Sequence, residues 1–532
     1  MAQSKLSCPS PTFSLDFKTK INHILKFAIL FLLFFLFNYS TPVAAAPSFY
    51  YVDNSVSSNG NGTQGSPWKN LSDINWTVIA SAPKPCTVYI SGGAISQTYN
   101  ETLKVGASGS SSTWPYNGTP TGELIIKRPS NTEWAGHSGV VYIRTPRGFA
   151  VDLSGTSNII IDGFDISSSG VNPGDGYGVR AYPATSYCVI RNCTITNCAG
   201  MGIALTRSNY VTIQNNILGP QSATAGDDDI APNGSHLVVE NNILTAQLSS
   251  GGAHADCIHM GTGGDEYIFR YNIFRVINTA YCVYVETDQC NPSIGGTGLP
   301  ITNVMIYGNL FEKSGDAGVG NAYEAICLRD DWSGNPPNNY STVYVYNNTF
   351  VNNGCCDPVG ASIFEDASCT SPNQHLFVEN NVFYNGRVWN VGVRGTTQFK
   401  LDYNVYYATS DAVSQVIINM GGKDYTSLSA FKAAYPGFEI HGSQGNPNLA
   451  EVSATIDPYH DLRPTADSTL LLGKGDPTLG SAYSNGLGMS TTISSWPLNV
   501  AIVPRGSAWD IGAYQYNYSS QRPNPPSNLR TN

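Results

Sequence analysis

Two stretches, LVVENNIL (237–244) and YIFRYNIF (267–274), decide the fold of this chain of 532 residues. In each, apolar residues alternate along a first segment, a two-residue break follows, and a second apolar segment comes after the break. Alternation with a period of two is typical of β-strands, so each stretch predicts two short strands joined by a tight bend.

The pattern recurs along the chain. The other copies are IIIDGFDI (159–166), CVIRNCTI (188–195), VTIQNNIL (211–218), VMIYGNLF (304–311), VYVYNNTF (343–350), LFVENNVF (376–383) and KLDYNVYY (400–407). From the second copy on, the second break residue is always Asn: Asn192, Asn216, Asn242, Asn272, Asn309, Asn348, Asn381 and Asn404. Asn tolerates the left-handed backbone conformation that a tight bend needs. Stacked copies would let these side chains hydrogen-bond from one copy to the next, as an Asn ladder.

A column of aliphatic residues follows the breaks and predicts a third strand in each copy. Its members are Val179, Ile203, Ile230, Ile258, Val283, Ile326, Ile363 and Val393. The large insertions, 287–300 and 330–340, come after this third strand. A regular repeat of this length indicates a solenoid or a propeller. Propeller blades lack a single fixed bend, and the Leu-x-x-Leu-x-Leu signature of leucine-rich repeats is absent from the sequence.

We therefore expect an all-β chain folded as a right-handed parallel β-helix, with three strands per coil, an Asn ladder and a cap at each end. The expected organisation is an N-terminal cap with the first coils (47–157), regular coils (158–407) and irregular C-terminal coils with a cap (408–520). A short helix is expected near 427–434, and a disordered tail, rich in Pro and Asn, over 521–532.

The N-terminus has the parts of a targeting segment. Lys18, Lys20 and Lys26 precede an apolar run over 27–37, and small residues follow at 43–46. This order is typical of a secretory signal peptide, and the apolar run is shorter than the ~20 residues that a membrane-spanning helix needs. Residues 1–46 are thus a signal peptide or an uncleaved signal anchor. After cleavage we expect no membrane span, and a secreted or cell-surface location, extracellular or periplasmic.

Composition narrows the partners. The net charge is −10, charged residues are 12% of the chain, and no strongly basic region occurs, so a nucleic-acid partner is not expected. An acidic protein needs local basic groups or a cation to hold an anionic glycan. The spacing of the 12 cysteines matches no zinc site; Cys188, Cys193 and Cys198 could pair locally or be small core residues. We expect a monomer.

Both ends of the repeat region resemble a known group. The entry segment PSFYYVDNSVSSNGNGTQGSPWKNLSDIN (47–75) and the closing segment VPRGSAWDIGAYQY (503–516) resemble those of secreted β-helix proteins of the pectin-lyase-like superfamily. In the closing segment Trp509 stands where a Pro recurs in that group, and Gln515 where a Glu recurs. The resemblance implies the fold and an extracellular polysaccharide as partner. It leaves the reaction open, because the superfamily includes lyases, hydrolases, epimerases and proteins of unknown role.

The resemblance to polysaccharide lyases implies a substrate groove along the third-strand sheet. Stacked strands also give a straight row of outward side chains about 4.8 Å apart, which suits a repeating polymer. One residue after the aliphatic column stand Arg180, Ala204, Ala231, His259, Tyr284, Cys327, Phe364 and Arg394. Three residues after it stand Tyr182, Thr206, Asn233, Gly261, Glu286, Arg329, Asp366 and Thr396.

Titratable side chains gather in the middle of these columns, and each is assigned a role. The predicted catalytic residues are Asp256, His259, Tyr284 and Arg329; the predicted substrate-binding residues are His254, Glu286, Arg180 and Arg394. Carboxylates brought together from adjacent coils repel unless a cation relieves them, so Asp227, Asp228 and Asp229 are predicted to bind Ca²⁺. The plain alternative is a solvated acidic turn beside a surface histidine.

Three classes of function remain open. A calcium-assisted polysaccharide lyase or C5-epimerase would use His259, Tyr284 or an arginine for proton transfer. A glycoside hydrolase would pair Asp228 with Asp256, or Asp256 with Glu286. A non-catalytic glycan-binding or adhesive β-helix would use exposed aromatics such as Trp332 and Trp389.

Overall fold

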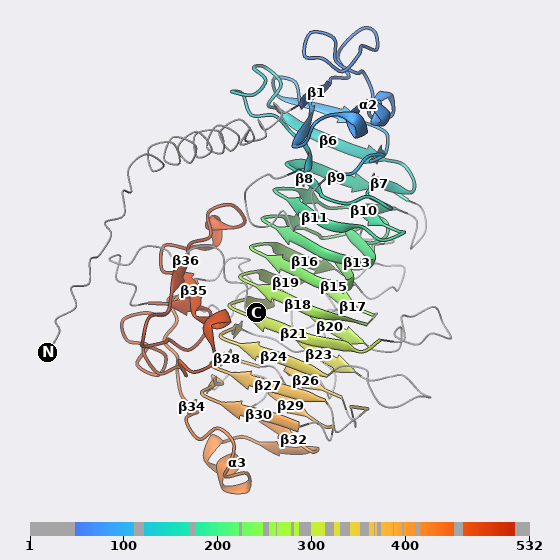
Figure 1. Ribbon diagram of the computed structural model, residues 1–532. Coiled ribbons are helices and arrows are strands. Elements are labelled where there is room, and N and C mark those ends of the chain that lie inside the picture. The colour runs from blue at the N-terminus through green and yellow to red at the C-terminus, as the bar shows by residue number, and fades with distance from the viewer. Residues whose placement is uncertain are drawn as a thin grey trace, which may run out of the picture. The chain divides into compact units, whose positions relative to one another are not determined.

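The computed structural model describes most of the chain from Ser48 to Tyr516 (Figure 1). The described ranges are 48–110, 122–170, 176–222, 226–247, 255–261, 263–277, 281–286, 299–313, 324–329, 341–351, 361–366, 368–369, 374–386, 388–395, 398–409, 415–451 and 461–516. The predicted signal peptide and the predicted tail lie outside these ranges. Within them, no helix is long and apolar enough to cross a membrane.

Successive coils stack in parallel and build three strand columns, as the repeat predicts. The first-strand column contains β1 (Ser48–Val52), β2 (Cys86–Ile90), β5 (Leu124–Lys127), β8 (Ile159–Asp162), β11 (Ser186–Arg191), β18 (Gly264–Arg270), β21 (Ile301–Tyr307), β24 (Thr342–Tyr346), β27 (His375–Glu379) and β30 (Gln398–Asp402). The second contains β3 (Ser96–Tyr99), β6 (Val140–Thr145), β9 (Phe164–Ser168), β12 (Thr194–Ile195), β14 (Ile217–Leu218), β16 (Ile243–Gln247), β19 (Ile273–Ile277), β22 (Leu310–Lys313), β25 (Thr349–Val351), β28 (Val382–Tyr384), β31 (Val405–Tyr407) and β34 (Ser443–Gln444).

The third-strand column carries the predicted groove. It contains β4 (Leu103–Lys104), β7 (Phe149–Asp152), β10 (Tyr177–Ala181), β17 (Ile258–Met260), β20 (Val283–Glu286), β23 (Ile326–Arg329), β26 (Ala361–Glu365), β29 (Trp389–Val393) and β32 (Ile418–Met420). The long strands β13 (Ile203–Gln214) and β15 (Ile230–Glu240) pass without a break from the third column into the first. The aliphatic column lies inside the coils, with Val179, Ile258 and Ile326 fully buried. The right-handed parallel β-helix is confirmed.

The Asn ladder exists, shifted by one residue at its start. The amide side chain and backbone N–H of Asn216 both donate to Asn242 Oδ1, at 3.0 and 2.9 Å, and the pattern continues through Asn272, Asn309, Asn348 and Asn381 to Asn404. The left-handed residue of each bend is the one before the ladder Asn, as in Asn215 and Asn241. Asn192 is such a bend residue, with φ 55°. Cys193 therefore takes the ladder position in that coil, and its N–H donates to Asn216 Oδ1.

Both ends of the apolar core are covered. At the first coils, α2 (Trp76–Ser81) buries Ile79 against the core. At the last coils, α3 (Leu428–Ala434) buries Phe431, and Ser427 Oγ accepts a hydrogen bond from Ala430 N as its N-cap. The predicted helix near 427–434 is confirmed, and Figure 1 shows it beyond the last coil.

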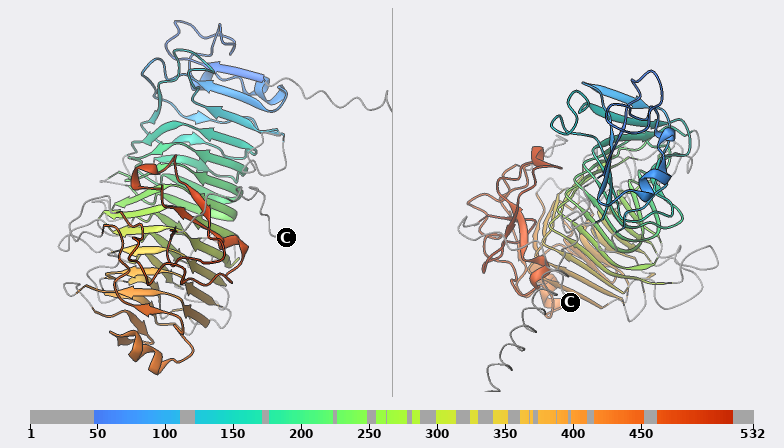
Figure 2. Two further views of the ribbon diagram at one scale, coloured as in Figure 1. Left: turned by 90° about the vertical axis from the view of Figure 1, so that its left-hand side faces the viewer. Right: turned by 45° about the horizontal axis from the view of Figure 1, so that its top comes forward.

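The closing segment does not stack as a last coil. Residues 461–516, the C-terminal arm, fold back along the coils, with β35 (Asn485–Gly488), β36 (Ile502–Pro504) and β37 (Tyr514–Gln515) in a small sheet of their own (Figures 1 and 2). Trp496 Nε1 donates to Tyr271 O at 2.8 Å, and Gly512 N donates to Asn380 O at 2.8 Å. The arm thus covers the bends between the first and second strands, where tyrosines leave an apolar surface.

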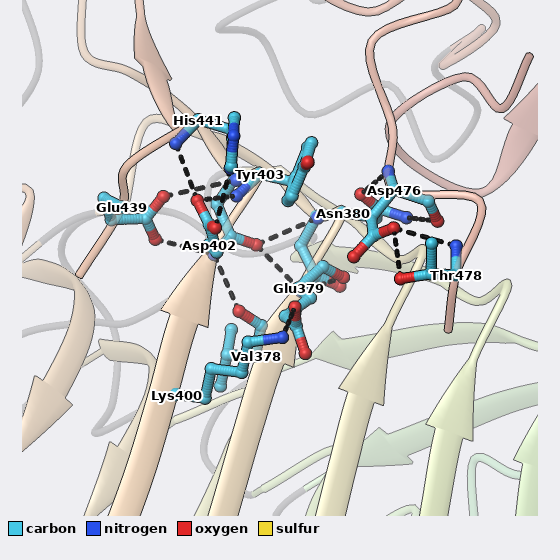
Figure 3. A network of polar contacts seen from close by, with 12 residues as sticks. Val378, Glu379, Asn380, Lys400, Asp402, Tyr403, Glu439, His441, Asp476 and Thr478 are labelled. Carbon is cyan, nitrogen blue, oxygen red and sulfur yellow. Dashed lines mark hydrogen bonds and ion pairs between the residues drawn. The ribbon is translucent and has the colours of Figure 1, made fainter. Parts of the chain in front are cut away.

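Figure 3 shows where the arm meets the last coils. Asn380, a bend residue, accepts a hydrogen bond from Asp476 N at 2.8 Å and donates one to Asp476 O. Nearby, Glu439 ends the Asn ladder: its carboxylate accepts from Asn404 Nδ2 and from Tyr406 OH, both at 2.7 Å. Glu439 is fully buried, so an acidic side chain terminates a ladder of neutral amides.

The described cysteines are buried and unlinked. Cys188, Cys193 and Cys198 belong to the apolar core and form no disulfide with one another, so they are small core residues.

Candidate functional site

The outer side of β17, β20 and β23 brings the predicted site residues together. Register pairs His259 with Tyr284 and Glu286 with Arg329 on adjacent coils. Figure 1 shows these strands stacked one below another, followed by β26 and β29. Because neighbouring strands lie about 4.8 Å apart, side chains in one column are within reach of each other.

His259 is held between carboxylates from three coils. Its Nδ1 lies 3.2 Å from Asp228 Oδ2 and 3.6 Å from Asp256 Oδ2, and its Nε2 lies 3.0 Å from Glu286 Oε2. The side chains of His259 and Glu286 are 10% and 14% exposed, whereas those of Asp228 and Asp256 are buried. The imidazole and Glu286 thus form the outer edge of the cluster.

Backbone donors fix the two buried carboxylates. Asp228 Oδ1 accepts a hydrogen bond from Asp256 N at 3.0 Å, and Asp256 Oδ1 accepts one from Tyr281 N at 2.9 Å. Each carboxylate is therefore oriented by the start of the next coil, with its second oxygen turned toward His259. The equivalence of Asp228 and Asp256, expected from their spacing to Ile230 and Ile258, is confirmed.

The electrostatics of the cluster favour a charged imidazole. Burial by itself lowers the pKa of His259, but the carboxylates of Asp228, Glu286 and Asp256 outweigh burial and hold this pKa well above its usual value. His259 is therefore an imidazolium at neutral pH, with both ring nitrogens donating.

Tyr284 extends the cluster along its own coil. Its hydroxyl donates to Glu286 Oε1 at 2.9 Å, and its ring centroid lies 5.0 Å from that of His259. Burial and the charge of Glu286 raise the pKa of Tyr284 well above its usual value, so the phenol keeps its proton. Glu286 thus accepts hydrogen bonds on both oxygens, from Tyr284 and from His259.

The three acidic residues predicted to bind calcium diverge. Asp228 faces His259, but Asp229 points into the coil, where Gln221 Nε2 donates to its Oδ1 at 2.9 Å. Burial raises the pKa of Asp229 well above its usual value, which favours the neutral acid. Asp227 is half-buried. Asp228 and Asp229 precede β15, which begins at Ile230, so their side chains do not follow the alternation of that strand.

The residues present do not fit a calcium ion. Calcium takes six to eight oxygen ligands. In the described part of the chain, the group of side chains that converges within 4.8 Å is Asp228, Asp256 and His259, which offers a ring nitrogen as one of three ligand atoms. His259 is the basic side chain that faces these carboxylates in the structure.

Arg394 lies in another column than the sequence suggested. Val391, and not Val393, pairs with Ile363, because β29 begins earlier, at Trp389. The residue of this coil that aligns with Ile363 is thus Val391, and Arg394 falls in the column of Glu286 and Arg329. Its guanidinium carbon lies 4.8 Å from the ring centroid of Trp389.

The remaining predicted residues lie apart from His259 or outside the described ranges. Arg180 is on β10, three coils before β17, and stacks over Phe149 at 3.9 Å. His254 and Trp332 lie outside the described residues. Trp389 is buried against Phe364 and Arg394, so the expectation of an exposed aromatic there was wrong.

Sequence reasoning missed Tyr281. Its ring stacks on Tyr284 with centroids 4.3 Å apart, and its N–H orients Asp256. The signal was available, because Tyr281 stands two residues before the inward Val283, as Asp256 stands two before Ile258.

Comparison with known proteins agrees with the fold. Residues 141–319 match the family described as "Right handed beta helix region". No curated protein matches the sequence. The resemblance to pectin-lyase-like proteins is thereby confirmed as a resemblance of fold.

Solved structures of similar fold are distant. The catalytic unit of a GH87 α-1,3-glucanase from Streptomyces thermodiastaticus is 12% identical, with a TM-score of 0.42 over 76% of this chain and 69% of that one. A rhamnogalacturonan lyase is 12% identical, with a TM-score of 0.42 over 80% and 98%. PfbA, a surface adhesin of Streptococcus pneumoniae, is 11% identical, with a TM-score of 0.36 over 60% and 77%. Likeness at this level carries no statement about the reaction.

Proposed function

We propose that this protein is an extracellular enzyme that acts on a uronate-containing polysaccharide by lyase or C5-epimerase chemistry, at the His259 cluster. The observation that carries the proposal is the His259 ring held 3.0 Å from Glu286 on the outer side of the sheet. Exposed Arg329 stands in register with Glu286 on the next coil.

Both reactions begin with loss of the proton on the carbon beside the sugar carboxylate. The negative charge that develops there must be stabilised, and a base must take the proton. Arg329 is the cation that would pair with the sugar carboxylate. Glu286 is the base, because its carboxylate lies at the partly exposed outer edge of the cluster, next to the proton donor His259.

His259 is the proton donor in this scheme. In an elimination, the carbon–oxygen bond to the leaving sugar breaks as the carbon–carbon double bond forms, and His259 gives its proton to the leaving oxygen. In an epimerisation, the proton returns to the same carbon from the opposite face. An imidazole with a raised pKa suits the donor role and excludes His259 as the base at neutral pH.

The hydrolase alternative has less support. Oxygens of Asp228 and Asp256 lie within 4.8 Å of each other, near the separation of about 5 Å used by retaining glycosidases. Both carboxylates are buried, however, and each accepts a backbone hydrogen bond, so neither faces a substrate.

A panel of glycans tests the proposal. The secreted protein is incubated with acidic and neutral polysaccharides, with and without a calcium chelator. Unsaturated uronate or an inverted C5 centre in the product supports the proposal. Saturated reducing ends indicate a hydrolase, and retention of the glycan without turnover indicates a binding protein. Loss of activity on chelation would restore the calcium hypothesis.

A matched pair of variants assigns the site. His259→Gln should lower kcat/KM by about 10²–10⁴-fold, the usual contribution of a general acid or base. His236→Gln is the control, because His236 also pairs with a carboxylate, Glu266 at 2.5 Å, but in a bend of another column. Equal activity of the two variants would place the chemistry elsewhere.

A further inference from the structure

The column of Glu286 continues beyond the His259 cluster as a row of alternating charges. Register pairs Glu286 with Arg329, and the pairs Leu328–Glu365 and Glu365–Val393 place Asp366 beside Arg329 and Arg394 beside Asp366. Four consecutive coils thus carry a carboxylate, an arginine, a carboxylate and an arginine at the same position.

These side chains face outward at the ends of their strands. Arg329 is exposed, and Glu286, Asp366 and Arg394 are half-buried. Asp366 Oδ1 accepts a hydrogen bond from Ser368 N at 2.8 Å, which fixes that carboxylate. Arg394 lies over Trp389, and its Nε has no hydrogen-bond partner among the described residues. The row is therefore a set of alternating charges in which Arg394 keeps an unpaired Nε–H.

The spacing between the charged side chains of the row matches the spacing of sugar units in an extended glycan. Adjacent coils are about 4.8 Å apart, so Arg329 and Arg394, two coils apart, are separated by about 9.6 Å along the row. A pyranose unit in an extended chain is about as long as one coil is thick. A glycan lying along the row would meet one coil with each sugar, and an arginine with every second sugar.

We propose that the substrate is a polysaccharide with a disaccharide repeat, in which an acidic sugar alternates with a neutral one. This inference rests on the proposed function and deepens it. Arg329 and Arg394 pair with the carboxylates of successive acidic sugars. Asp366 accepts hydrogen bonds from the hydroxyl or amide groups of the neutral sugar between them.

The same row discriminates against a polymer with a carboxylate on every sugar. Such a chain would place a carboxylate opposite Asp366, and like charges at close range oppose binding. A continuous row of arginines would favour a uniform polyanion, but this chain interrupts the row with an acid.

The test compares polymers with variants of the row. Hyaluronan and heparosan, which alternate a uronate with an N-acetylhexosamine, are compared with polygalacturonate and polyguluronate, in which every sugar is a uronate. Binding and turnover are measured for the full secreted chain. We expect at least a tenfold preference for the alternating polymers, and Arg394→Ala should weaken their binding about tenfold.

Asp366→Asn is the sharper variant. It keeps an oxygen for Ser368 N and removes the charge, so it should improve binding of polygalacturonate and leave hyaluronan little changed. Arg191→Ala, which removes an arginine paired with Asp162 in the first-strand column, is the control and should change neither. Thermal unfolding of each variant verifies that it folds.

The outcomes of these experiments distinguish failure of the alternating-substrate inference from failure of the proposed lyase or epimerase function. A preference for uniform polyuronates, or no effect of Asp366→Asn on them, would overturn the alternating substrate and leave the lyase or epimerase intact. If no acidic polymer of either kind is bound or turned over, the proposed function itself fails, and this inference fails with it.

Discussion

His259 Nε2 and Glu286 Oε2 lie 3.0 Å apart across two adjacent coils, and this contact places a proton donor and a proton acceptor side by side on the outer side of the sheet. The contact depends on stacking, because residues 27 positions apart in the sequence meet only when β17 and β20 are in register. The buried carboxylates behind His259 determine its charge.

Asp228→Asn should shift the pH dependence of activity. Asp228 is the carboxylate that does most to raise the pKa of His259, so removing its charge lowers that pKa. The proposed reaction needs the protonated imidazole and loses activity as pH rises through this pKa. The alkaline limb of kcat/KM should therefore move to lower pH in the variant, as a pH–rate profile would show.

Asp229→Asn is the matched control for that profile. Asp229 is adjacent in sequence but points into the coil, where it accepts a hydrogen bond from Gln221, and its raised pKa favours the neutral acid. The substitution should leave the alkaline limb in place. A shift equal to that of Asp228→Asn would mean that the two acids act together, as a calcium site over 227–229 would require.

Glu439 should make the fold less stable as pH rises. Burial raises the pKa of this carboxyl from 4.5 to about 7, so between these values the folded chain binds a proton that the unfolded chain does not. Stability from this group is present below about pH 4.5 and is lost by about pH 7, and the shift corresponds to at most about 3 kcal/mol.

Denaturant unfolding of the wild type and Glu439→Gln at pH 5 and pH 8 measures this loss. The variant lacks the titrating group, so its stability should fall less between the two pH values. A wild type and variant with the same pH dependence would show that Glu439 does not titrate in this range.

The Asn ladder should contribute strongly to stability. Asn309 is fully buried; it donates to Asn348 and to Phe269 O and accepts from Asn272. Asn309→Ala leaves these buried groups without partners and should lower the free energy of unfolding by about 2–4 kcal/mol. Asn131→Ala, at an exposed turn, should cost less than about 1 kcal/mol. Similar losses in urea titrations of both variants would contradict a structural ladder.

The C-terminal arm should detach when its buried arginine is removed. The Arg505 guanidinium donates to the carbonyls of Asp510 and Gly512 at 2.7 and 2.8 Å, within the arm itself. Arg505→Met leaves these carbonyls unpaired and should open 461–516 to limited proteolysis before the coils are cut. Lys423→Met, on an exposed side chain of β33 (Lys423–Tyr425), is the control. Simultaneous cleavage of arm and coils would show that the arm does not unfold separately.

The periodicity of apolar residues predicted the coils because each coil packs equivalent side chains into the core. Ile203, Ile230, Ile258 and Val283 fill equivalent places in the core, so their spacing reveals both the strands and their register. In the aliphatic column the register failed where the pattern offered two buried residues, Val391 and Val393, and the one not paired with Ile363 was chosen. That choice displaced Arg394 from its true column.

The contacts of the C-terminal arm and the direction of Asp229 follow no repeat in the sequence. The arm binds Tyr271 and Asn380 through contacts between segments far apart in the sequence, and no periodic pattern encodes such pairs. The site was predicted in part: adjacent coils had to bring Asp256, His259 and Glu286 together. The inward turn of Asp229 occurs before β15 begins at Ile230, and no alternating pattern shows which of three consecutive acids points inward.

Solvent exchange at the sugar carbon tests the central claim most directly. A uronate polymer that the protein binds is incubated with it in D₂O, and the hydrogen beside the carboxylate is followed by NMR. We predict that the wild type removes this hydrogen, by exchange with deuterium or by elimination, and that Glu286→Gln does not. Cleavage to saturated reducing ends with the hydrogen retained would contradict the account.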